Sequence, residues 1–130
     1  MQEKVLQDAA MKIVHQAYAP YSKFHVGAAL LCENGEIITG VNVENCAYGL
    51  ATCAERNAIS TAVTLGYRKF IAVAIFSPHS QEYITPCGAC RQIMAEFMDS
   101  EVPIYLGNAA GEFTCRKLEE LLPMNFKLDV

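Results

Sequence analysis

The sequence has no run of basic residues and few charges of either sign. Of its 130 residues, 10 are lysine or arginine and 14 are aspartate or glutamate, which gives a formal net charge of −4 at pH 7. Proteins that bind nucleic acids usually carry a basic face, because neutralising phosphates releases counterions. The missing basic face therefore argues against a nucleic-acid partner.

Long apolar runs are also missing. The first residues, Met1 to Lys4, lead into an amphipathic pattern and not into the continuous apolar stretch of a signal peptide or membrane span. We therefore expect a cytoplasmic protein with no membrane partner, in a compartment where thiols stay reduced. The sequence shows no internal repeat and no linker, and we expect a single domain over residues 1–130.

Apolar residues are plentiful by comparison. Hydrophobic residues make up 52% of the chain and charged residues only 18%. A chain of this size with so few charges is expected to leave apolar surface uncovered, which favours association of subunits.

One pair of the six cysteines has the spacing of metal ligands. Cys87 and Cys90 form a Cys-x-x-Cys pair that follows Pro86 directly. Proline suits the first position of a helix, so we expect a helix that begins at Pro86 and carries both thiols on one face. An apolar stripe continues behind the pair at Ile93, Met94 and Phe97.

A second segment places a thiol beside a carboxylate. Thr52 and Glu55 match the Thr-x-x-Glu capping box, which predicts a helix with Cys53 and Glu55 in its first turn. Residues two apart do not face each other on a helix, so both reach one metal only if it lies beyond the helix N-terminus. Arg56 follows Cys53 by three residues, where its guanidinium could hydrogen-bond a ligand sulfur and tune the charge of the site.

The two segments together predict a catalytic zinc site with one zinc per chain. Its three ligands would be Cys53, Cys87 and Cys90, with a fourth position left for water and Glu55 as the general base. Two helix N-termini would then converge on the metal, and their dipoles would offset the negative charge of three thiolates.

Other interpretations of the individual motifs stay open. A Cys-x-x-Cys pair also occurs in redox proteins and closed structural zinc sites, and Glu55 alone could be a helix cap. The combination argues against a closed site, since the remaining cysteines and the histidines have no partner at suitable spacing. These residues are Cys32, Cys46, Cys115, His15, His25 and His79.

Apolar periodicity predicts an α/β fold with helices on both faces of a sheet. Asn42 and Glu44 fall at the end of a predicted strand, where polar side chains can face a ligand or simply form a turn. The Asn34-Gly35 pair predicts a hairpin between the first two strands. Besides the helices at the cysteine segments, we expect a helix over 3–18, strands over 24–32, 36–43, 69–77, 102–106 and 112–114, and a helical turn over 118–122.

The cysteine segments, Cys53-Ala54-Glu55 and Pro86-Cys87-Gly88-Ala89-Cys90, resemble the signature of zinc-dependent nucleoside deaminases. The chain is similar over nearly its whole length to the small homotetrameric type of the cytidine deaminase family. This resemblance implies a three-layer α/β/α sandwich around a five-stranded mixed sheet of order 2-1-3-4-5. It also implies hydrolytic deamination of cytidine and deoxycytidine to uridine and deoxyuridine with release of ammonia, a step of pyrimidine salvage.

The resemblance also implies roles for individual residues. Glu55 would move protons, and Asn42 and Glu44 would hold the ribose hydroxyls of a nucleoside. The backbone of Ala54 and Cys87 would contact the pyrimidine. The aromatic residues would contact the base or cross between subunits that share active sites, and these are Phe24, Tyr48 and Phe126.

Three alternative functions remain at this point. A deaminase of a related nucleoside such as blasticidin S would share the zinc signature. A non-catalytic zinc-binding module would not need Glu55, and a thiol–disulfide protein would not need Cys53 beside the Cys-x-x-Cys pair. Asn42 with Glu44 suits a free sugar, because a phosphate would favour arginine or lysine at these positions.

Overall fold

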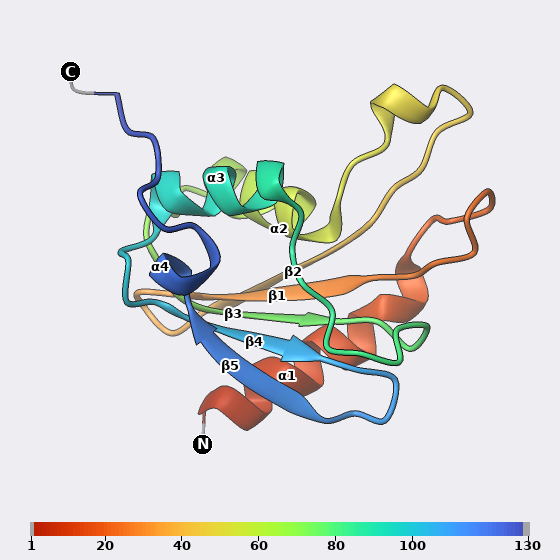
Figure 1. Ribbon diagram of the computed structural model, residues 1–130, viewed down its shortest axis with the longest axis horizontal. Coiled ribbons are helices and arrows are strands. Elements are labelled where there is room, and N and C mark those ends of the chain that lie inside the picture. Colours follow the sequence, from red (N-terminus) through yellow and green to blue (C-terminus); the bar gives the residue numbers. More distant parts are fainter. Residues whose placement is uncertain (1, 129–130) are drawn as a thin grey trace.

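Five strands form one mixed sheet in the order β2-β1-β3-β4-β5 in the computed structural model, which describes residues 2–128 (Figure 1). The pair β3 and β4 is parallel, and every other neighbouring pair is antiparallel. This confirms the mixed sheet and the strand order implied by the family resemblance. The strands are β1 (Gly27–Cys32), β2 (Ile37–Val41), β3 (Phe70–Phe76), β4 (Pro103–Gly107) and β5 (Phe113–Lys117).

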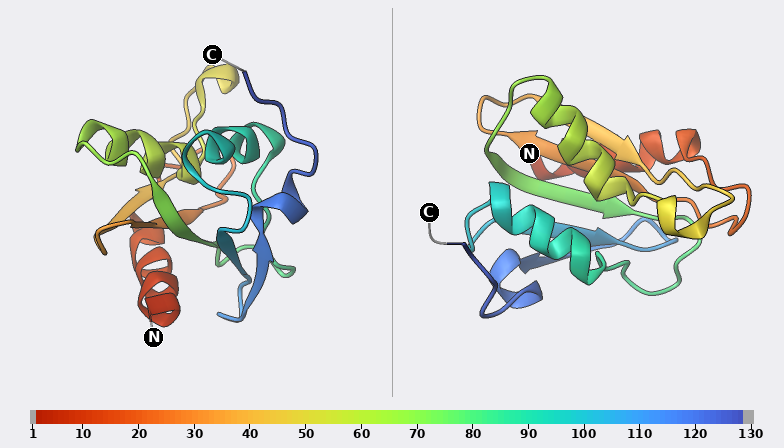
Figure 2. Two further views of the ribbon diagram at one scale, coloured as in Figure 1. Left: turned by 90° about the vertical axis from the view of Figure 1, so that its left-hand side faces the viewer. Right: turned by 90° about the horizontal axis from the view of Figure 1, so that it is seen from above.

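Helices cover both faces of this sheet. The N-terminal helix α1 lies on one face, whereas α2 and α3 lie side by side on the other, so the molecule has three layers (Figure 2). The α-helices are α1 (Gln2–Ile13), α2 (Ala54–Thr64), α3 (Gly88–Phe97) and the short α4 (Leu118–Leu121). Two 3₁₀ turns are η1 (Val14–Gln16) and η2 (Tyr48–Leu50).

The strand β1 shows how the sheet divides the apolar core. All six of its residues are buried, because both faces of the strand are covered by helices. Side chains alternate along a strand, so Leu30 packs into the cluster beneath α2 and α3, and Leu31 packs into the cluster beneath α1. The near-continuous apolar sequence of β1 is the expected sequence of such a doubly covered strand.

The hairpin between β1 and β2 forms at the predicted Asn34-Gly35 pair. Gly35 has a φ of 96°, a left-handed conformation that favours glycine. The side-chain oxygen of Asn34 accepts a hydrogen bond from the backbone of Glu36 at 3.1 Å, and Cys32 N–H donates to the Glu36 carbonyl at 2.8 Å. The turn sequence therefore sets the register of the two strands.

Several element boundaries differ from the sequence prediction. The N-terminal helix ends at Ile13 and a 3₁₀ turn carries the chain only to Gln16, because Tyr18 leaves the helix to pair with the segment after β2. The first strand begins at Gly27 and not at residue 24. The last strand extends to Lys117 and not to 114, since β5 pairs with the whole length of β4.

Strand β2 lies unusually close to the first turns of α2. A Cβ atom added at Gly40 would lie 2.4 Å from the backbone nitrogen of Ala58 and 2.7 Å from the carbonyl oxygen of Ala54. Neither backbone atom can move aside cheaply, so only glycine fits at this crossing. The absence of a side chain at Gly40 thus brings the end of β2 close to the start of α2.

No helix within residues 2–128 has the length and apolar character needed to cross a membrane. All six cysteines lie within the described residues and are free thiols.

Candidate zinc site and adjoining cavity

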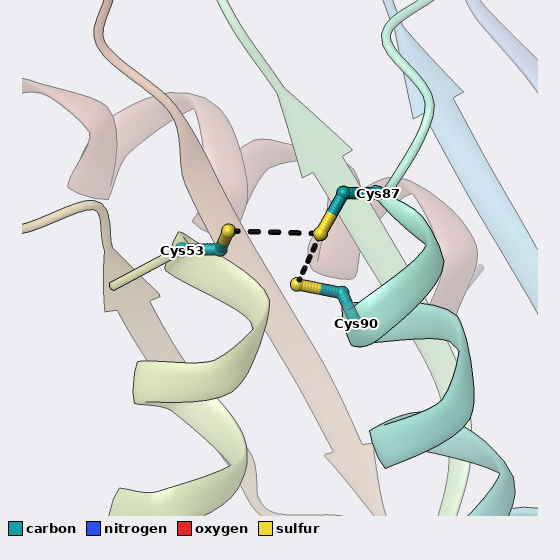
Figure 3. A group of neighbouring side chains, drawn as sticks. All are labelled: Cys53, Cys87 and Cys90. Atoms are coloured by element: carbon teal, nitrogen blue, oxygen red, sulfur yellow. Dashed lines mark hydrogen bonds between the residues drawn. The ribbon is translucent and has the colours of Figure 1, made fainter. Parts of the chain in front are cut away.

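Three cysteine sulfurs meet above the sheet, where the first turns of α2 and α3 face each other (Figure 3). Cys53 Sγ lies 3.9 Å from Cys87 Sγ, which in turn lies 3.4 Å from Cys90 Sγ. A tetrahedral zinc with Zn–S distances of about 2.3 Å separates its sulfur ligands by about 3.8 Å. The three thiols therefore already have the spacing of ligands to one zinc ion.

Each thiol lies at the start of a helix, although the helices begin at other residues than predicted. Cys53 is the N-cap of α2 and Cys87 the N-cap of α3, so both helices begin one residue or more later than the sequence suggested. Thr52 and Pro86 precede the helices and do not cap or open them. Neither N-cap side chain makes a capping hydrogen bond to the backbone of its own helix, so the first N–H groups and the positive dipole end of each helix lie free beside the sulfurs.

The surroundings of the sulfurs favour a thiolate at Cys53. The pKa of Cys53 is lowered to about 6, mainly by its hydrogen bond with the Cys90 thiol. The Cys87 thiol and the charge of Arg56 lower this pKa further, whereas partial burial acts in the opposite direction. The pKa of Cys90 is raised, first by its contact with Cys53 and then by burial. Arg56 acts on Cys53 through its charge, and within residues 2–128 no hydrogen bond joins its guanidinium to a ligand sulfur.

Glu55 lies in the first turn of α2, almost completely buried. Its side chain is 5% exposed, and burial raises the pKa of the carboxyl group to about 7, with a further contribution from the neighbouring Cys53. A carboxyl group with a pKa near neutrality can both accept and donate a proton at physiological pH. The position beside the thiol cluster is the one expected for a general acid–base group.

A cavity of about 270 Å³ connects the thiol cluster to the polar end of β2. Cys53, Cys87 and Glu55 line one part of it, and Asn42 and Glu44 line another. The remaining lining comes from Val26, Ala51, Thr52, Ala54, Ile84 and Thr85. The structure therefore brings two of the predicted metal ligands, the predicted acid–base group and the predicted ribose contacts into a single hollow, and the sulfur of the third ligand, Cys90, lies 3.4 Å from the Cys87 sulfur.

The carboxamide of Asn42 is fixed by the chain that precedes β1. Its nitrogen donates to the Phe24 carbonyl at 2.8 Å, and its oxygen accepts from Val26 N–H at 2.9 Å. These bonds hold the Asn42 side chain, which lines the cavity, against residues 24–26. The Phe24 ring lies 5.9 Å from the ring of His79 and is 38% exposed.

A second hollow of about 350 Å³ adjoins the cavity and shares Glu44 and Ala51 with it. Tyr21 and Tyr48 line this hollow, with their rings 6.4 Å apart and edge to face. Tyr48 is 79% exposed, on the η2 segment that stands away from the sheet (Figure 1). Within one chain Tyr48 thus approaches Glu44 from outside and does not line the metal cavity.

Comparison with known proteins identifies the family. The family model for the cytidine and deoxycytidylate deaminase zinc-binding region matches residues 1–106. The chain belongs to this family. It is 43% identical to a cytidine deaminase of Halalkalibacterium halodurans over 97% of this chain and 95% of that protein, and 46% identical to one of Sporosarcina psychrophila over 95% and 90%. The crystal structure of the cytidine deaminase from Burkholderia pseudomallei superposes with a TM-score of 0.92, at 42% identity over 97% of this chain and 100% of that one.

The family's zinc fits the donor set of this chain. Thiolates are ordinary zinc ligands, three protein ligands leave one position open, and the sulfur separations match a single tetrahedral ion. Zinc is therefore the cofactor of this deaminase domain, and the cluster of Cys53, Cys87 and Cys90 is able to hold a metal ion.

Three predicted aromatic contacts, Phe24, Tyr48 and Phe126, are not among the residues that line the cavity, and Phe126 lies on the C-terminal tail. It is 69% exposed on the C-terminal tail, and its carbonyl accepts a hydrogen bond from the Gln92 side chain on α3 at 3.0 Å. Around it lies a separate hollow formed by Ala95, Glu96 and the tail itself. Within one chain Phe126 does not reach the cavity, so its predicted role depends on a second subunit.

Two residues that the sequence prediction did not select make contacts at this site. The Ser22 hydroxyl donates to the Glu44 carboxylate, and Asn57 on α2 donates to the Val41 carbonyl at 2.7 Å and to Thr52 Oγ1 at 3.0 Å. An asparagine inside a helix is locally unfavourable, which is a weak signal for a tertiary role. Ser22 carries no such signal, because its partner is 22 residues away.

Proposed function

We propose that this chain catalyses the zinc-dependent hydrolytic deamination of cytidine and deoxycytidine to uridine and deoxyuridine with release of ammonia. The supporting observation is the single cavity that carries Glu55 and two thiols of the cysteine cluster, Cys53 and Cys87, at one part and Asn42 with Glu44 at another. A nucleoside has the matching polarity, with a reactive amidine on the base and hydroxyl groups on the sugar.

The acid–base chemistry falls to Glu55. When bound, zinc supplies Lewis-acid chemistry that lets water act as a nucleophile near neutral pH. Glu55 takes one proton from the attacking water and delivers it to ring N3. It then takes the second proton from the hydroxyl now bonded to C4 and delivers it to the amino group, which leaves C4 as ammonia while the C4 carbonyl forms. A buried carboxyl group with a pKa of about 7 suits this shuttle, since it exchanges protons at neutral pH without a large energetic penalty.

The other part of the cavity recognises the sugar. Asn42 and Glu44 hold the ribose hydroxyls, and the backbone of Ala54 contacts the pyrimidine. No lysine or arginine lines the cavity within the described residues, which disfavours a nucleotide phosphate. The substrate class is therefore the free nucleoside, as in pyrimidine salvage in the cytoplasm.

The active unit is a homotetramer of single-domain subunits, each spanning 1–130, with active sites shared between neighbours. Large apolar side chains are exposed on two protruding segments, with Tyr48 at 79% and Leu50 at 68% on η2 and Phe126 at 69% on the tail. Such surfaces are typical of interfaces. In the tetramer Phe24 and Phe126 contact the base, and Tyr48 and Phe126 cross between subunits.

Sequence similarity to another deaminase supports a second candidate substrate. The chain is 34% identical to the blasticidin-S deaminase of Bacillus cereus over 81% of this chain and 79% of that protein. Loss of ultraviolet absorbance from cytidine, measured beside cytosine, adenosine and blasticidin S, decides between the two. We expect turnover of cytidine and deoxycytidine that stops when zinc is removed and returns when zinc is restored. Turnover of blasticidin S alone, or of no substrate, would reject the proposal.

A further inference from the structure

Glu44 owes its orientation to a turn on a distant part of the chain. Its Oε1 atom accepts hydrogen bonds from the backbone N–H groups of Tyr21 and Ser22, both at 3.1 Å. Its Oε2 atom accepts a hydrogen bond from the Ser22 hydroxyl. Tyr21 and Ser22 follow α1, whereas Glu44 follows β2, so the contact exists only in the folded chain.

The Ser22 hydroxyl has a second partner. It accepts a hydrogen bond from the backbone N–H of Phe24 at 3.0 Å. A serine that only formed a turn would make this local bond and nothing more. The donation to Glu44 is not needed by the turn, and it links the backbone of Phe24 to the carboxylate that lines the cavity.

The arrangement determines which oxygen of Glu44 remains available. A carboxylate offers about four acceptor positions, two on each oxygen. Oε1 already accepts two N–H groups, and Oε2 accepts one hydroxyl. Oε2 therefore keeps one acceptor position for a group in the cavity, and a sugar hydroxyl is the donor that the proposed function places there.

We propose that Ser22 is a positioning residue for sugar recognition, which acts by holding the Glu44 carboxylate with Oε2 open to one hydroxyl of the substrate. The inference rests on the proposed function, because it takes Glu44 as the sugar contact. Ser22 itself is exposed, and its removal leaves no buried polar group unpaired, so a variant at this position is expected to fold normally.

The test compares ligands that differ only in the sugar. Inhibition constants are measured for uridine and for 2′,3′-dideoxyuridine, which lacks both ring hydroxyls. Ser22→Ala should raise the inhibition constant for uridine and the KM for cytidine by roughly fivefold to tenfold, because it weakens a hydrogen bond to a charged group. The same variant should change kcat by no more than about twofold. The constant for dideoxyuridine should stay within about twofold.

Two further variants separate positioning from general damage. Ser22→Thr keeps the hydroxyl and should restore uridine binding to near the original value. Ser60→Ala removes an exposed serine of α2 outside the residues that line either hollow, and should change neither constant. Equal weakening of both ligands by Ser22→Ala, or no weakening of either, would overturn the inference.

A double-mutant cycle distinguishes failure of this inference from failure of the proposed sugar contact. Glu44→Gln should weaken uridine strongly and dideoxyuridine little, and adding Ser22→Ala to it should have almost no further effect. Full additivity would show that Ser22 does not act through Glu44. If Glu44→Gln leaves uridine binding unchanged, the sugar contact itself is wrong, whatever Ser22 does.

Discussion

Two glutamates of the same cavity have opposite environments. Glu55 is buried at the start of α2, and burial raises the pKa of its carboxyl group to about 7. Glu44 lies at the other part of the cavity, where the Ser22 hydroxyl, the Ser22 N–H and the Tyr21 N–H lower the pKa of its carboxyl group. The first carboxyl group is prepared to exchange protons, and the second is prepared to remain an anion.

The difference comes from hydrogen-bond donors and burial, since the residue type is the same. Burial without charged donors favours the neutral acid, whereas several N–H and O–H donors favour the carboxylate. One chain can therefore use glutamate for chemistry in one position and for binding in another. This division predicts that the two residues affect different kinetic parameters.

The largest expected effect is at the metal end. Cys87→Ala should abolish measurable turnover and lower the zinc content below one ion per chain, because two thiolates hold zinc poorly. Metal analysis by mass spectrometry and the cytidine assay check both results, with Cys115→Ala as a control outside the cluster. Activity in a zinc-free protein would contradict the zinc site, on which the comparison of Glu55 with Glu44 depends.

The next effect separates the two glutamates. Glu55→Gln keeps the shape of the side chain but cannot shuttle protons, so kcat should fall at least on the order of a hundredfold while zinc stays bound. Glu44→Gln should act mainly on KM. Steady-state kinetics of both variants, with zinc content measured beside them, provide the check. Near-normal kcat in Glu55→Gln would reduce this residue to a part of the helix start.

A third prediction uses the inactive Glu55→Gln chain to test whether sites are shared. Phe126→Ala removes an aromatic surface whose stacking on a base is worth about 1–3 kcal/mol, so kcat/KM should fall while zinc remains. Mixing Phe126→Ala with Glu55→Gln under conditions of subunit exchange should create some intact sites and restore part of the activity.

The control for the mixing experiment is a Glu55→Gln chain that also carries Phe126→Ala. This partner can supply no aromatic side chain, so no recovery is expected from it. Equal activity in the two mixtures, or a fully active monomer in light scattering at assay concentration, would contradict the shared site.

The smallest effect is expected at Arg56, whose charge helps to lower the pKa of Cys53. Arg56→Gln leaves the cluster of three thiolates more negative and the metal less acidic, so activity should fall modestly and the acidic limb of the pH–rate profile should move to higher pH. Zinc content should stay near one per chain. An unshifted profile would show that Arg56 does not tune the site.

The spacing of Cys87 and Cys90 predicted two members of the thiol cluster, and the capping-box pattern around Cys53 together with the family resemblance predicted the third. The strand order came from the resemblance to a family and not from periodicity, since apolar runs do not say which strands are neighbours. The start of α2 was predicted too early because Thr52 matches a capping box, whereas its hydroxyl accepts a hydrogen bond from Asn57. The start of α3 was predicted at Pro86, two residues before its first helical residue Gly88.

The contacts of Ser22 and Asn42 could not have been predicted from local sequence. Both depend on the segment after α1 lying beside the end of β2, where Tyr18 N–H donates to the Asn42 carbonyl at 3.0 Å and Glu44 N–H donates to the Tyr18 carbonyl at 2.9 Å. These residues are more than 20 positions apart, and their pairing follows from the tertiary arrangement alone.

The glycine at the crossing of β2 and α2 has a consequence for mutational tolerance. Gly40 lies outside the residues that line the cavity and carries no reactive group, yet a single added methyl group would push the strand bearing Asn42 away from the helix bearing Cys53 and Glu55. In a saturation scan it should therefore be as intolerant as a catalytic position. A random substitution of Gly40 would inactivate the protein because it changes the distance between β2 and α2, which carry the two parts of the site, although Gly40 itself does not line the cavity.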